Sequence, residues 1–358
     1  MDQAASLLRA AVARGRCPGL QYIAVDRSRT LFELHAGLAD VATRRPVVSG
    51  STMMAYSMSK TLTAAAVLQL AGESRLGLDD PVARHLPWQP YGGRITMRQL
   101  LAHTSGIPNP FPLRWVHAAS AHAAFDEATA LRDVLARHPR LAFEPGSRFA
   151  YSNVGYWLLG AIVERVTGRA FAAHVAEHVL DPLGATRELG YSVPEPRTHA
   201  HGYLERYSMF GVLAPWLIDR ELIGGTTGRW VEIRPHYVNG PAFGGLVGTA
   251  GGFARFLKDQ LAPHSVLFDD RTKALFVEPQ RTRDGRTVPM TLGWHVRGNG
   301  GVRQLYKEGG GGGFHCMMRL YPDHGLGSVL MTNATGNDVS SLLDAVDGEI
   351  LAARPAPS

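Results

Sequence analysis

Lysine is rare in this chain, and two of its lysines lie in motifs that could do chemistry. Of 37 basic residues in the 358-residue sequence, only four are lysine. Lys60 follows Ser57 by three residues, and Lys307 precedes Glu308 and the glycines 309–313. A desolvated lysine can lose its proton and act as a neutral base, whereas arginine stays charged in proteins. The placement of lysine therefore points to acid–base chemistry.

The first motif pairs a hydroxyl with an amine. On a helix, Ser57 and Lys60 share a face, so their side chains can meet. In a first helical turn, the hydroxyl of Ser57 also lies near unpaired backbone N–H groups and the positive end of the helix dipole, which favours negative charge on its oxygen. A chain this long contains on the order of one Ser-x-x-Lys by chance. The alternative interpretation is a helix start followed by a surface lysine.

The second motif is Tyr151-Ser152-Asn153. A tyrosine phenol has an unperturbed pKa of about 10. Two nearby lysines are expected to lower this pKa and make the phenolate an accessible base. Asn153 offers an amide donor and an acceptor for a substrate or for the Lys60 ammonium. Taken alone, the motif is equally a helix N-terminus capped by Ser152 or Asn153.

The third motif is the glycine run that follows Lys307 and Glu308. Without side chains, this segment lets a substrate lie against the strand backbone, where N–H groups can reach a carbonyl oxygen. A flexible glycine loop is the alternative. An apolar strand, 314–320, continues beyond the glycines.

In this order and at these separations, the three motifs resemble those of the serine β-lactamase and penicillin-binding-protein superfamily. The tyrosine motif makes the class C β-lactamase branch, with its family VIII carboxylesterase relatives, the closer likeness. The resemblance extends over roughly residues 10–350. Other stretches similar to that branch are 37–40, 97–107, 153–156 and 181–184.

The resemblance implies that three residues carry out the chemistry. Ser57 is the expected acylated nucleophile. Lys60 and Tyr151 are expected to share the proton transfers, first from the serine and later from water. The residues leave open which of the two is the base. No metal or other cofactor is implied.

The resemblance also implies residues that bind substrate. Asn153 is expected to orient the substrate and Lys60, and Lys307 to tune Tyr151 electrostatically. The N–H groups of Ser57 and Gly310, beside Gly309, are the expected oxyanion hole, where loss of one donor costs about 2.7–4 kcal/mol.

Glu308 departs from the family pattern, because β-lactamases usually carry a hydroxyl residue there that helps to hold the substrate's carboxylate. A carboxylate pointing into the cleft would repel that group, although strand alternation could turn Glu308 to the face opposite Lys307. The sequence therefore predicts a carboxylesterase acting on short or medium acyl esters through an acyl-enzyme. The alternatives are a β-lactamase, a D-amino-acid peptidase or an acyltransferase with the same residues, and a penicillin-binding protein that is acylated without turnover.

Strand patterns near both chain ends and a helical middle predict an α/β (α+β) fold. The resemblance implies that this fold is of the β-lactamase and DD-peptidase type. An antiparallel sheet flanked by helices is expected from 1–77 and 246–358, with an inserted, mostly helical domain over 78–245 and the site in the cleft between them. The expected strands are 20–26, 31–36, 289–297, 302–307, 313–321 and 326–332. The expected helices are 3–14, 57–75, 97–102, 125–138, 153–167, 170–179 and 338–352.

Composition narrows the expected partners. The net charge of +6 is dispersed along the chain without a block of like charge, so a small-molecule ester or amide is expected rather than nucleic acid or a membrane. The two cysteines, Cys17 and Cys316, do not form a disulfide framework. The N-terminus lacks the features of a secretory signal, which predicts a cytoplasmic enzyme unless a leader was removed. The oligomeric state stays open.

Three further patterns have a structural as well as a functional interpretation. His174, Glu177 and His178 match an inverted zinc-protease pattern, but the expected helix leads to Asp181 as in relatives without metal, and no zinc is expected. His103 is expected to brace a loop. Aromatic and aliphatic residues are dense over 203–245. A core is the first interpretation of this segment, and an acyl-binding wall or lid, extended by Phe111, Pro112 and Trp115, is the second. The residues concerned are Tyr203, Tyr207, Met209, Phe210, Trp216, Trp230, Tyr237 and Phe243.

Overall fold

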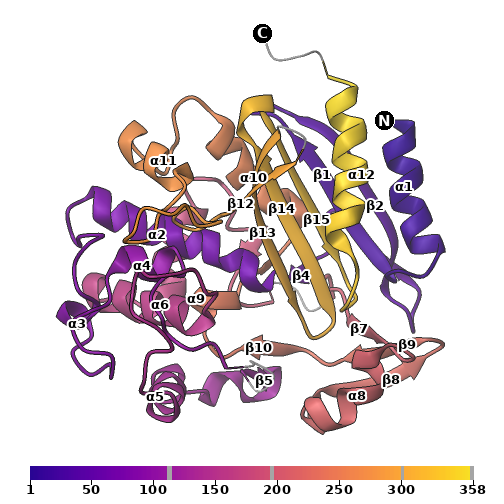
Figure 1. The fold of residues 1–358 in the computed structure, drawn as a ribbon. Coiled ribbons are helices and arrows are strands. Elements are labelled where there is room, and N and C mark those ends of the chain that lie inside the picture. The colour runs from indigo at the N-terminus through magenta and orange to yellow at the C-terminus, as the bar shows by residue number, and fades with distance from the viewer. Residues whose placement is uncertain (111–114, 194–196, 300–301, 355–358) are drawn as a thin grey trace.

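The fold is built on a seven-stranded sheet in which all neighbouring strands are antiparallel (Figure 1). The computed structural model describes residues 1–354 apart from 111–114, 194–196 and 300–301. The strand order is β12-β13-β14-β15-β1-β2-β3, so strands from the two ends of the chain lie side by side. These strands are β1 (Gly19–Val25), β2 (Thr30–Asp40), β3 (Arg45–Pro46), β12 (His295–Asn299), β13 (Val302–Gly311), β14 (Phe314–Tyr321) and β15 (Leu326–Thr332).

Helices cover both faces of this sheet. The terminal helices α1 (Asp2–Ala13) and α12 (Val339–Ala352) lie together on one face (Figure 1), where Leu8, Tyr22 and Leu330 belong to one buried cluster. Helix α10 (Ala250–Leu261) packs against β1 and β15. Every residue of β1 and β15 is buried, as expected for strands covered on both sides.

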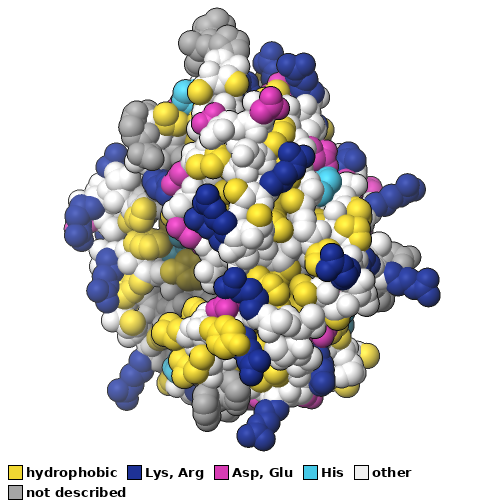
Figure 2. All heavy atoms as spheres, turned by 90° about the vertical axis from the view of Figure 1, so that its right-hand side faces the viewer, with side chains coloured by type: hydrophobic (Ala, Val, Ile, Leu, Met, Phe, Trp, Pro, Cys, Tyr) yellow, Lys and Arg dark blue, Asp and Glu magenta, His cyan; other side chains and the backbone are white. Residues whose placement is uncertain are grey.

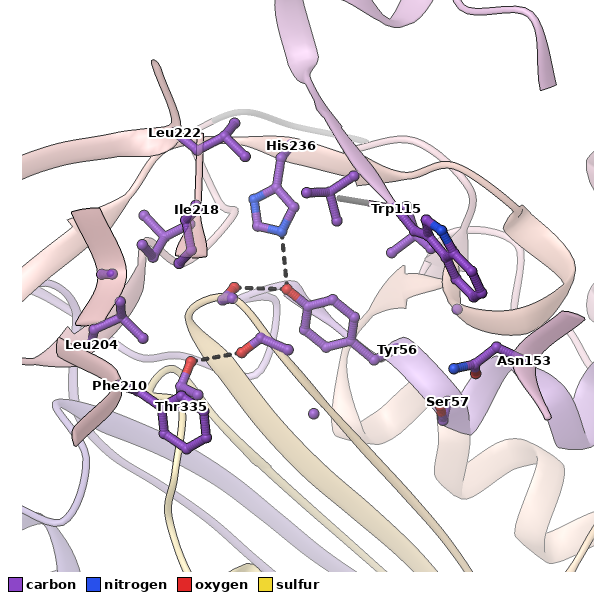
Figure 3. Close-up of a pocket in the computed structure, with 18 of the residues that line it drawn as sticks. Tyr56, Ser57, Trp115, Asn153, Leu204, Phe210, Ile218, Leu222, His236 and Thr335 are labelled. Carbon is purple, nitrogen blue, oxygen red and sulfur yellow. Dashed lines mark hydrogen bonds between the residues drawn. The ribbon is translucent and has the colours of Figure 1, made fainter. Parts of the chain in front are cut away.

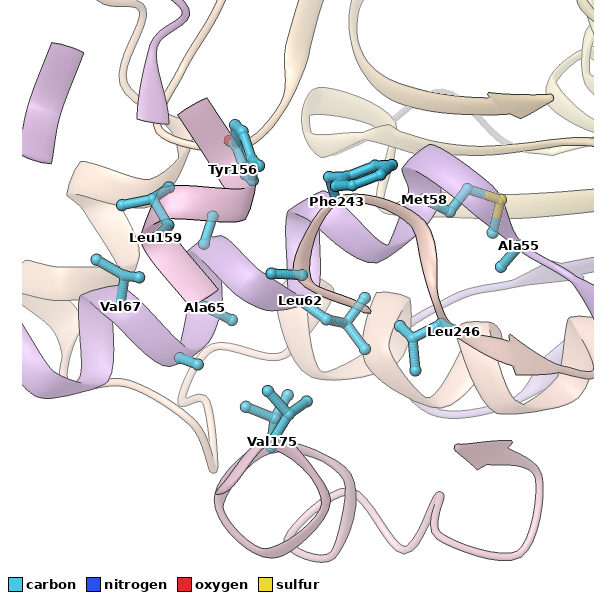
Figure 4. Close-up of a cluster of buried hydrophobic side chains, with 14 of the residues drawn as sticks. Ala55, Met58, Leu62, Ala65, Val67, Tyr156, Leu159, Val175, Phe243 and Leu246 are labelled. Carbon is cyan, nitrogen blue, oxygen red and sulfur yellow. The ribbon is translucent and has the colours of Figure 1, made fainter. Parts of the chain in front are cut away.

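Helix α2 (Ser59–Gly72) is the centre of the helical part of the molecule. It carries a run of small alanines and is buried nearly all round, so α6 (Asn153–Thr167) and α9 (Pro241–Gly244) can pack closely on it. Figure 4 shows Leu62 and Val67 of α2 facing a cluster that includes Leu159 of α6. The remaining α-helices are α3 (Val82–His85), α4 (Met97–Leu101), α5 (Glu127–Arg137), α7 (Phe171–Val175), α8 (Met209–Leu217) and α11 (Asp270–Val277).

Several predicted elements have different bounds in the structure: β2 ends at Asp40, β13 ends at Gly311, and the helix predicted over 170–179 is divided into α7 and a π-helical turn. Two others begin later than predicted. Helix α2 begins at Ser59, because Tyr56 has a φ of 44° and the residues Tyr56–Met58 form a separate 3₁₀ turn that holds Ser57. The strand predicted over 289–297 is β12, which begins at His295. A turn precedes it, in which Thr291 and Trp294 are joined by two hydrogen bonds.

A small three-stranded sheet within the middle of the chain was not predicted. It has the order β7-β9-β8 and lies next to helix α8 (Figure 1). The division into two domains with the predicted bounds stays a prediction. The short strands are β4 (Met53–Met54), β5 (Val116–Ala118), β6 (Leu189–Gly190), β7 (Gly202–Glu205), β8 (Ile223–Thr227), β9 (Trp230–Ile233), β10 (His236–Val238) and β11 (Val247–Gly248).

Surface charge is dispersed on the face that Figure 2 presents, where Lys and Arg side chains alternate with acidic and apolar ones instead of gathering in one patch. Among the helices that the structure describes, none is both long and apolar enough to cross a membrane.

Candidate active site

Ser57 lies in the 3₁₀ turn directly before α2 and beside the end of strand β13. The turn is anchored by Ser59, whose hydroxyl donates to the Tyr56 carbonyl oxygen (2.6 Å) and accepts from the Leu246 N–H (2.9 Å). Strand β13 approaches so closely that a Cβ on Gly309 would lie 2.1 Å from the carbonyl oxygen of Ala55. A side chain at position 309 would therefore push the strand away from the turn that carries Ser57.

The structure brings Ser57, Lys60 and Tyr151 together. The Lys60 Nζ donates to the Ser57 Oγ over 2.9 Å, and the Tyr151 hydroxyl donates to the same oxygen over 2.8 Å. Lys60 also donates to the carbonyl oxygen of Phe243 (2.6 Å), which fixes its amine. Both contacts of the serine are short enough for direct proton transfer.

Two lysines are buried in this site without a carboxylate. Lys60 and Lys307 have no exposed side-chain surface, and neither forms an ion pair with a described residue. Burial lowers the pKa of Lys307 from 10.5 to about 7. Burial, and then the charge of Lys307, hold the pKa of Lys60 well below its usual value. A neutral amine beside Ser57 is therefore accessible near neutral pH.

The expectation that two lysines lower the pKa of Tyr151 is wrong for this site. Burial raises the pKa of the Tyr151 phenol above its ordinary value, and the hydrogen bond to Ser57 offsets only part of that rise. The Nζ atoms of Lys60 and Lys307 lie 5.1 and 5.4 Å from the centre of the Tyr151 ring. Because the same burial favours neutral lysines, they offer the phenolate little compensating charge.

The predicted substrate-binding residues lie around the serine. Asn153 is the first residue of α6, where its N–H donates to the Asn109 Oδ1 (2.9 Å). Asn153 and Gly310 line the same cavity as Ser57. Gly310 faces His315 across the β13–β14 ladder.

Glu308 points away from this site. Its side chain is 44% exposed, whereas Lys307 beside it is fully buried, as the alternation of a strand requires. The Glu308 carboxylate lies 2.6 Å from the Nε2 of His315 on the neighbouring strand. It therefore does not present negative charge to a bound substrate.

An apolar cavity of about 330 Å³ leads to Ser57 (Figure 3). None of the described residues that line it is Lys, Arg, Asp or Glu. Its polar groups are few and include His236 and Thr335, which sequence reasoning missed because they become neighbours only in the fold. The apolar lining residues are Trp115, Val116, Leu204, Phe210, Ala214, Ile218, Leu222, Ile233, Val238 and Phe243.

The aromatic segment 203–245 is only partly core. Tyr203, Trp230 and Phe243 are buried, but Tyr207 and Met209 are 74% and 69% exposed, so the core interpretation is wrong for these two. Phe210, which is also exposed, lines the cavity together with Trp115 and Phe243, as the second interpretation expected. Phe111 and Pro112 lie outside the described residues, as does the side chain of Trp216.

Two histidine rings pack against the Tyr151 ring. The His103 ring lies 4.4 Å from the Tyr151 ring, and its Nδ1 accepts from the Ser152 N–H (3.2 Å). The ring of His295, which the sequence did not single out, stacks 6.0 Å from Tyr151. Burial holds the pKa of His103 well below 6.5 and lowers that of His295 to about 2, so both rings are neutral near pH 7.

The zinc-like pattern lies elsewhere, on α7 and the π-helical turn that follows it. The rings of His174 and His178 lie 4.4 Å apart. No group of three His, Cys, Asp or Glu side chains suited to a metal ion gathers in the described part of the chain.

Comparison with known proteins assigns the chain to a family. The sequence matches the Beta-lactamase family over residues 4–351. It is 27% identical over 319 residues to penicillin-binding protein 4* of Bacillus subtilis (strain 168), covering 87% of this chain and 67% of that protein. It is also 33% identical over 177 residues to protein flp of Staphylococcus aureus (strain MW2), covering 48% of this chain and 34% of that protein. The chain thus spans only about a third of the staphylococcal relative.

A solved structure agrees at the level of the fold. The D-amino acid amidase from Ochrobactrum anthropi SV3, in complex with L-phenylalanine, superposes with a TM-score of 0.79 and 20% identity, covering 99% of both chains. Since the family match spans nearly the whole chain, the protein belongs to the Beta-lactamase family, within the serine hydrolases of the β-lactamase and penicillin-binding-protein superfamily.

Proposed function

We propose that this protein is a carboxylesterase whose Ser57 accepts short or medium, uncharged acyl groups. The observation that carries the proposal is the cavity beside Ser57, which is lined by apolar side chains and, among the described residues, by no acid, lysine or arginine. A charged acyl group would lose its hydration there without gaining a partner. Glu308 points outward and therefore adds no negative charge to the cavity.

The proposed acylation uses Lys60 as the base. The Ser57 Oγ attacks the ester carbonyl carbon while its proton passes to the neutral Lys60 amine, 2.9 Å away. The tetrahedral oxyanion is stabilised by the N–H groups of Ser57 and Gly310. The carbon–oxygen bond to the alcohol then breaks, and the alcohol leaves with the proton that Lys60 took from Ser57, which makes the Lys60 amine neutral again.

In the proposed deacylation, Tyr151 stays a phenol, because burial raises its pKa. A water molecule gives a proton to Lys60 and attacks the acyl carbon, and the acid leaves as the proton returns to the Ser57 Oγ. The Tyr151 hydroxyl, 2.8 Å from that oxygen, is placed to stabilise it as it departs. Lys307 contributes a second amine behind the Tyr151 ring.

The test is a parallel assay of three substrate classes. We expect turnover of p-nitrophenyl esters from acetate to octanoate, and much slower turnover of D-phenylalanine amide and of a chromogenic cephalosporin. Ser57→Ala is expected to abolish ester turnover and labelling by a fluorophosphonate while the circular dichroism spectrum is retained. Rapid lactam or amide turnover without ester hydrolysis would favour the β-lactamase or peptidase alternatives. A stoichiometric burst without steady state would indicate an acylated but non-turning-over protein.

A further inference from the structure

Tyr56, the residue before the nucleophile, combines a bulky side chain with a left-handed backbone. Its φ of 44° is rare for any residue other than glycine. Such conformations persist where the surrounding structure holds them in place, and they gather at functional sites. The contacts of the Tyr56 side chain show what holds this residue.

The Tyr56 ring fills the space that Gly311 leaves empty. A Cβ added to Gly311 would lie 2.5 Å from the Cε1 and Cζ atoms of Tyr56. The Tyr56 hydroxyl lies 2.7 Å from the carbonyl oxygen of Gly312 and 2.9 Å from the Nε2 of His236 (Figure 3). One side chain thus joins the nucleophile's turn to the end of β13 and to β10.

His236 fixes the orientation of the phenol. Its Nδ1 lies 2.9 Å from the Arg234 carbonyl oxygen, and only 6% of the residue is exposed. A neutral imidazole has one N–H and one lone pair. If its Nδ1–H donates to Arg234, Nε2 accepts from the phenol. In the other tautomer, Nε2–H donates to the phenol, which then donates to Gly312. The hydroxyl is therefore bonded in either tautomer.

We propose that Tyr56 is a positioning residue that holds the segment Gly310–Gly312 at a fixed distance from Ser57. Because Gly310 directly precedes the two glycines that Tyr56 contacts, its N–H is then kept aimed at the oxyanion. The inference rests on the proposed acyl transfer at Ser57 and adds a residue that the family motifs do not include. The ring itself lines the cavity. Loss of the whole ring would therefore also change the shape of the cavity, whereas loss of the hydroxyl alone removes only its hydrogen bonds.

The test compares Tyr56→Phe with Tyr91→Phe. Tyr91 is a matched control, because it is buried and its hydroxyl also donates to a backbone carbonyl, that of His138. We expect Tyr56→Phe to lower kcat for p-nitrophenyl butyrate about tenfold, less than the loss of a complete oxyanion donor. The KM should change by less than about twofold, since the ring still lines the cavity. Butylboronic acid, which forms a tetrahedral adduct on Ser57, should bind about tenfold more weakly.

Two further variants separate positioning from general destabilisation. His236→Gln keeps a side chain that can donate or accept, so its loss of kcat should be smaller than that of Tyr56→Phe. Gly311→Ala forces a methyl group against the ring and should lower kcat by a factor similar to that of Tyr56→Phe. Since both changes displace the same glycine segment, the double variant should lose less than the product of the two single losses.

The rate at which a fluorophosphonate phosphonylates Ser57 can be measured without knowing the natural substrate, so it tests the role of Tyr56 separately from the esterase proposal. If ester turnover is absent but Ser57 is labelled, the esterase proposal fails while the labelling rates still test Tyr56. If Tyr56→Phe is labelled as fast as Tyr91→Phe and binds the boronic acid as tightly as the wild type, the positioning role is wrong. Absence of labelling in the wild type would contradict both proposals.

Discussion

Two buried polar clusters lie on different sides of the sheet and differ in how charge is balanced. In the catalytic cluster (Ser57, Lys60, Tyr151 and Lys307), both lysines are buried without a carboxylate, and Lys307 Nζ has no hydrogen-bond partner among the described residues. The second cluster, the Arg319 cluster, lies between the sheet and α12. It contains Arg319, Asp344, Asp347, Tyr22, Tyr321 and Ser328.

In the Arg319 cluster, each buried charge is compensated. The Arg319 Nη1 donates to Asp344 over 2.7 Å and lies 3.6 Å from Asp347. Asp347 in turn accepts hydrogen bonds from Tyr22, Tyr321 and Ser328 at 2.7–2.8 Å. Burial still raises the pKa of Asp347 above 3.8, but Arg319 and the three hydrogen bonds oppose that rise, whereas no carboxylate opposes the lowering of the lysine pKa values in the catalytic cluster. The comparison indicates that the catalytic cluster gains reactivity at the expense of stability.

The largest expected effect on activity comes from replacing the Lys60 amine with a group that cannot lose its proton. We expect Lys60→Arg to lower kcat/KM for p-nitrophenyl butyrate by about 10³-fold or more, since a guanidinium stays protonated and cannot act as a base. Steady-state kinetics measure this, with Lys258→Arg on α10 as the matched control. If Lys60→Arg kept most of the activity, Lys60 would not be the base.

The next effect concerns the stability of the Arg319 cluster. Asp347→Ala removes the carboxylate and leaves Arg319 less compensated, so we expect the free energy of unfolding to fall by about 3–5 kcal/mol. Activity per folded molecule should be nearly unchanged, because the cluster lies away from Ser57. Urea denaturation followed by circular dichroism measures the loss. The exposed Asp323→Ala is the control and should change stability by less than about 0.5 kcal/mol. An equal loss of stability in both variants would contradict the stabilising role of the Arg319 cluster.

Lys307→Met is expected to have the opposite effect on stability. The folded pKa of Lys307, about 7, lies below its ordinary 10.5, so the unfolded chain binds more protons between these pH values. The free energy of unfolding contributed by this residue therefore rises with pH across that window and is lowest below pH 7. At pH 6 the melting temperature of the variant should be about 2–5 °C above that of the wild type, although the variant should lose activity. The difference in melting temperature should become smaller toward pH 10. Thermal melts at several pH values measure this. A lower melting point at pH 6 would argue against a destabilising lysine.

The smallest effect is expected at the residue that departs from the family pattern. Glu308→Gln changes an exposed carboxylate on the far side of β13, so kcat/KM for neutral esters should change by less than about twofold. The same assay at low and high salt is the check. A tenfold gain or loss would mean that Glu308 reaches the substrate.

Local patterns made much of this molecule predictable. Strands β13 to β15 and helix α12 follow from apolar runs bounded by Gly and Pro, and the Ser57–Lys60 contact follows from the spacing of one helical turn. The positions of Tyr151 and Lys307 followed only from the family resemblance, because their approach to Ser57 depends on distant segments. The Tyr56–His236 contact spans 180 residues and had no signal in the sequence. The exposed residues before and on α8 resembled core by composition alone, since composition does not tell which face is covered.

The pairing of β1 with β15 has a consequence for how the protein is made. The Gly19 N–H donates to the side chain of Asn333, 314 residues further along the chain, so the sheet cannot close until β15 has been synthesised. Ser57 and Lys60 leave the ribosome early, and Lys307 and Gly310 leave it late. Contacts of such long range slow folding and leave apolar strands uncovered in the meantime. A nascent chain released before β13 therefore carries the nucleophile but neither the second amine nor the glycine strand.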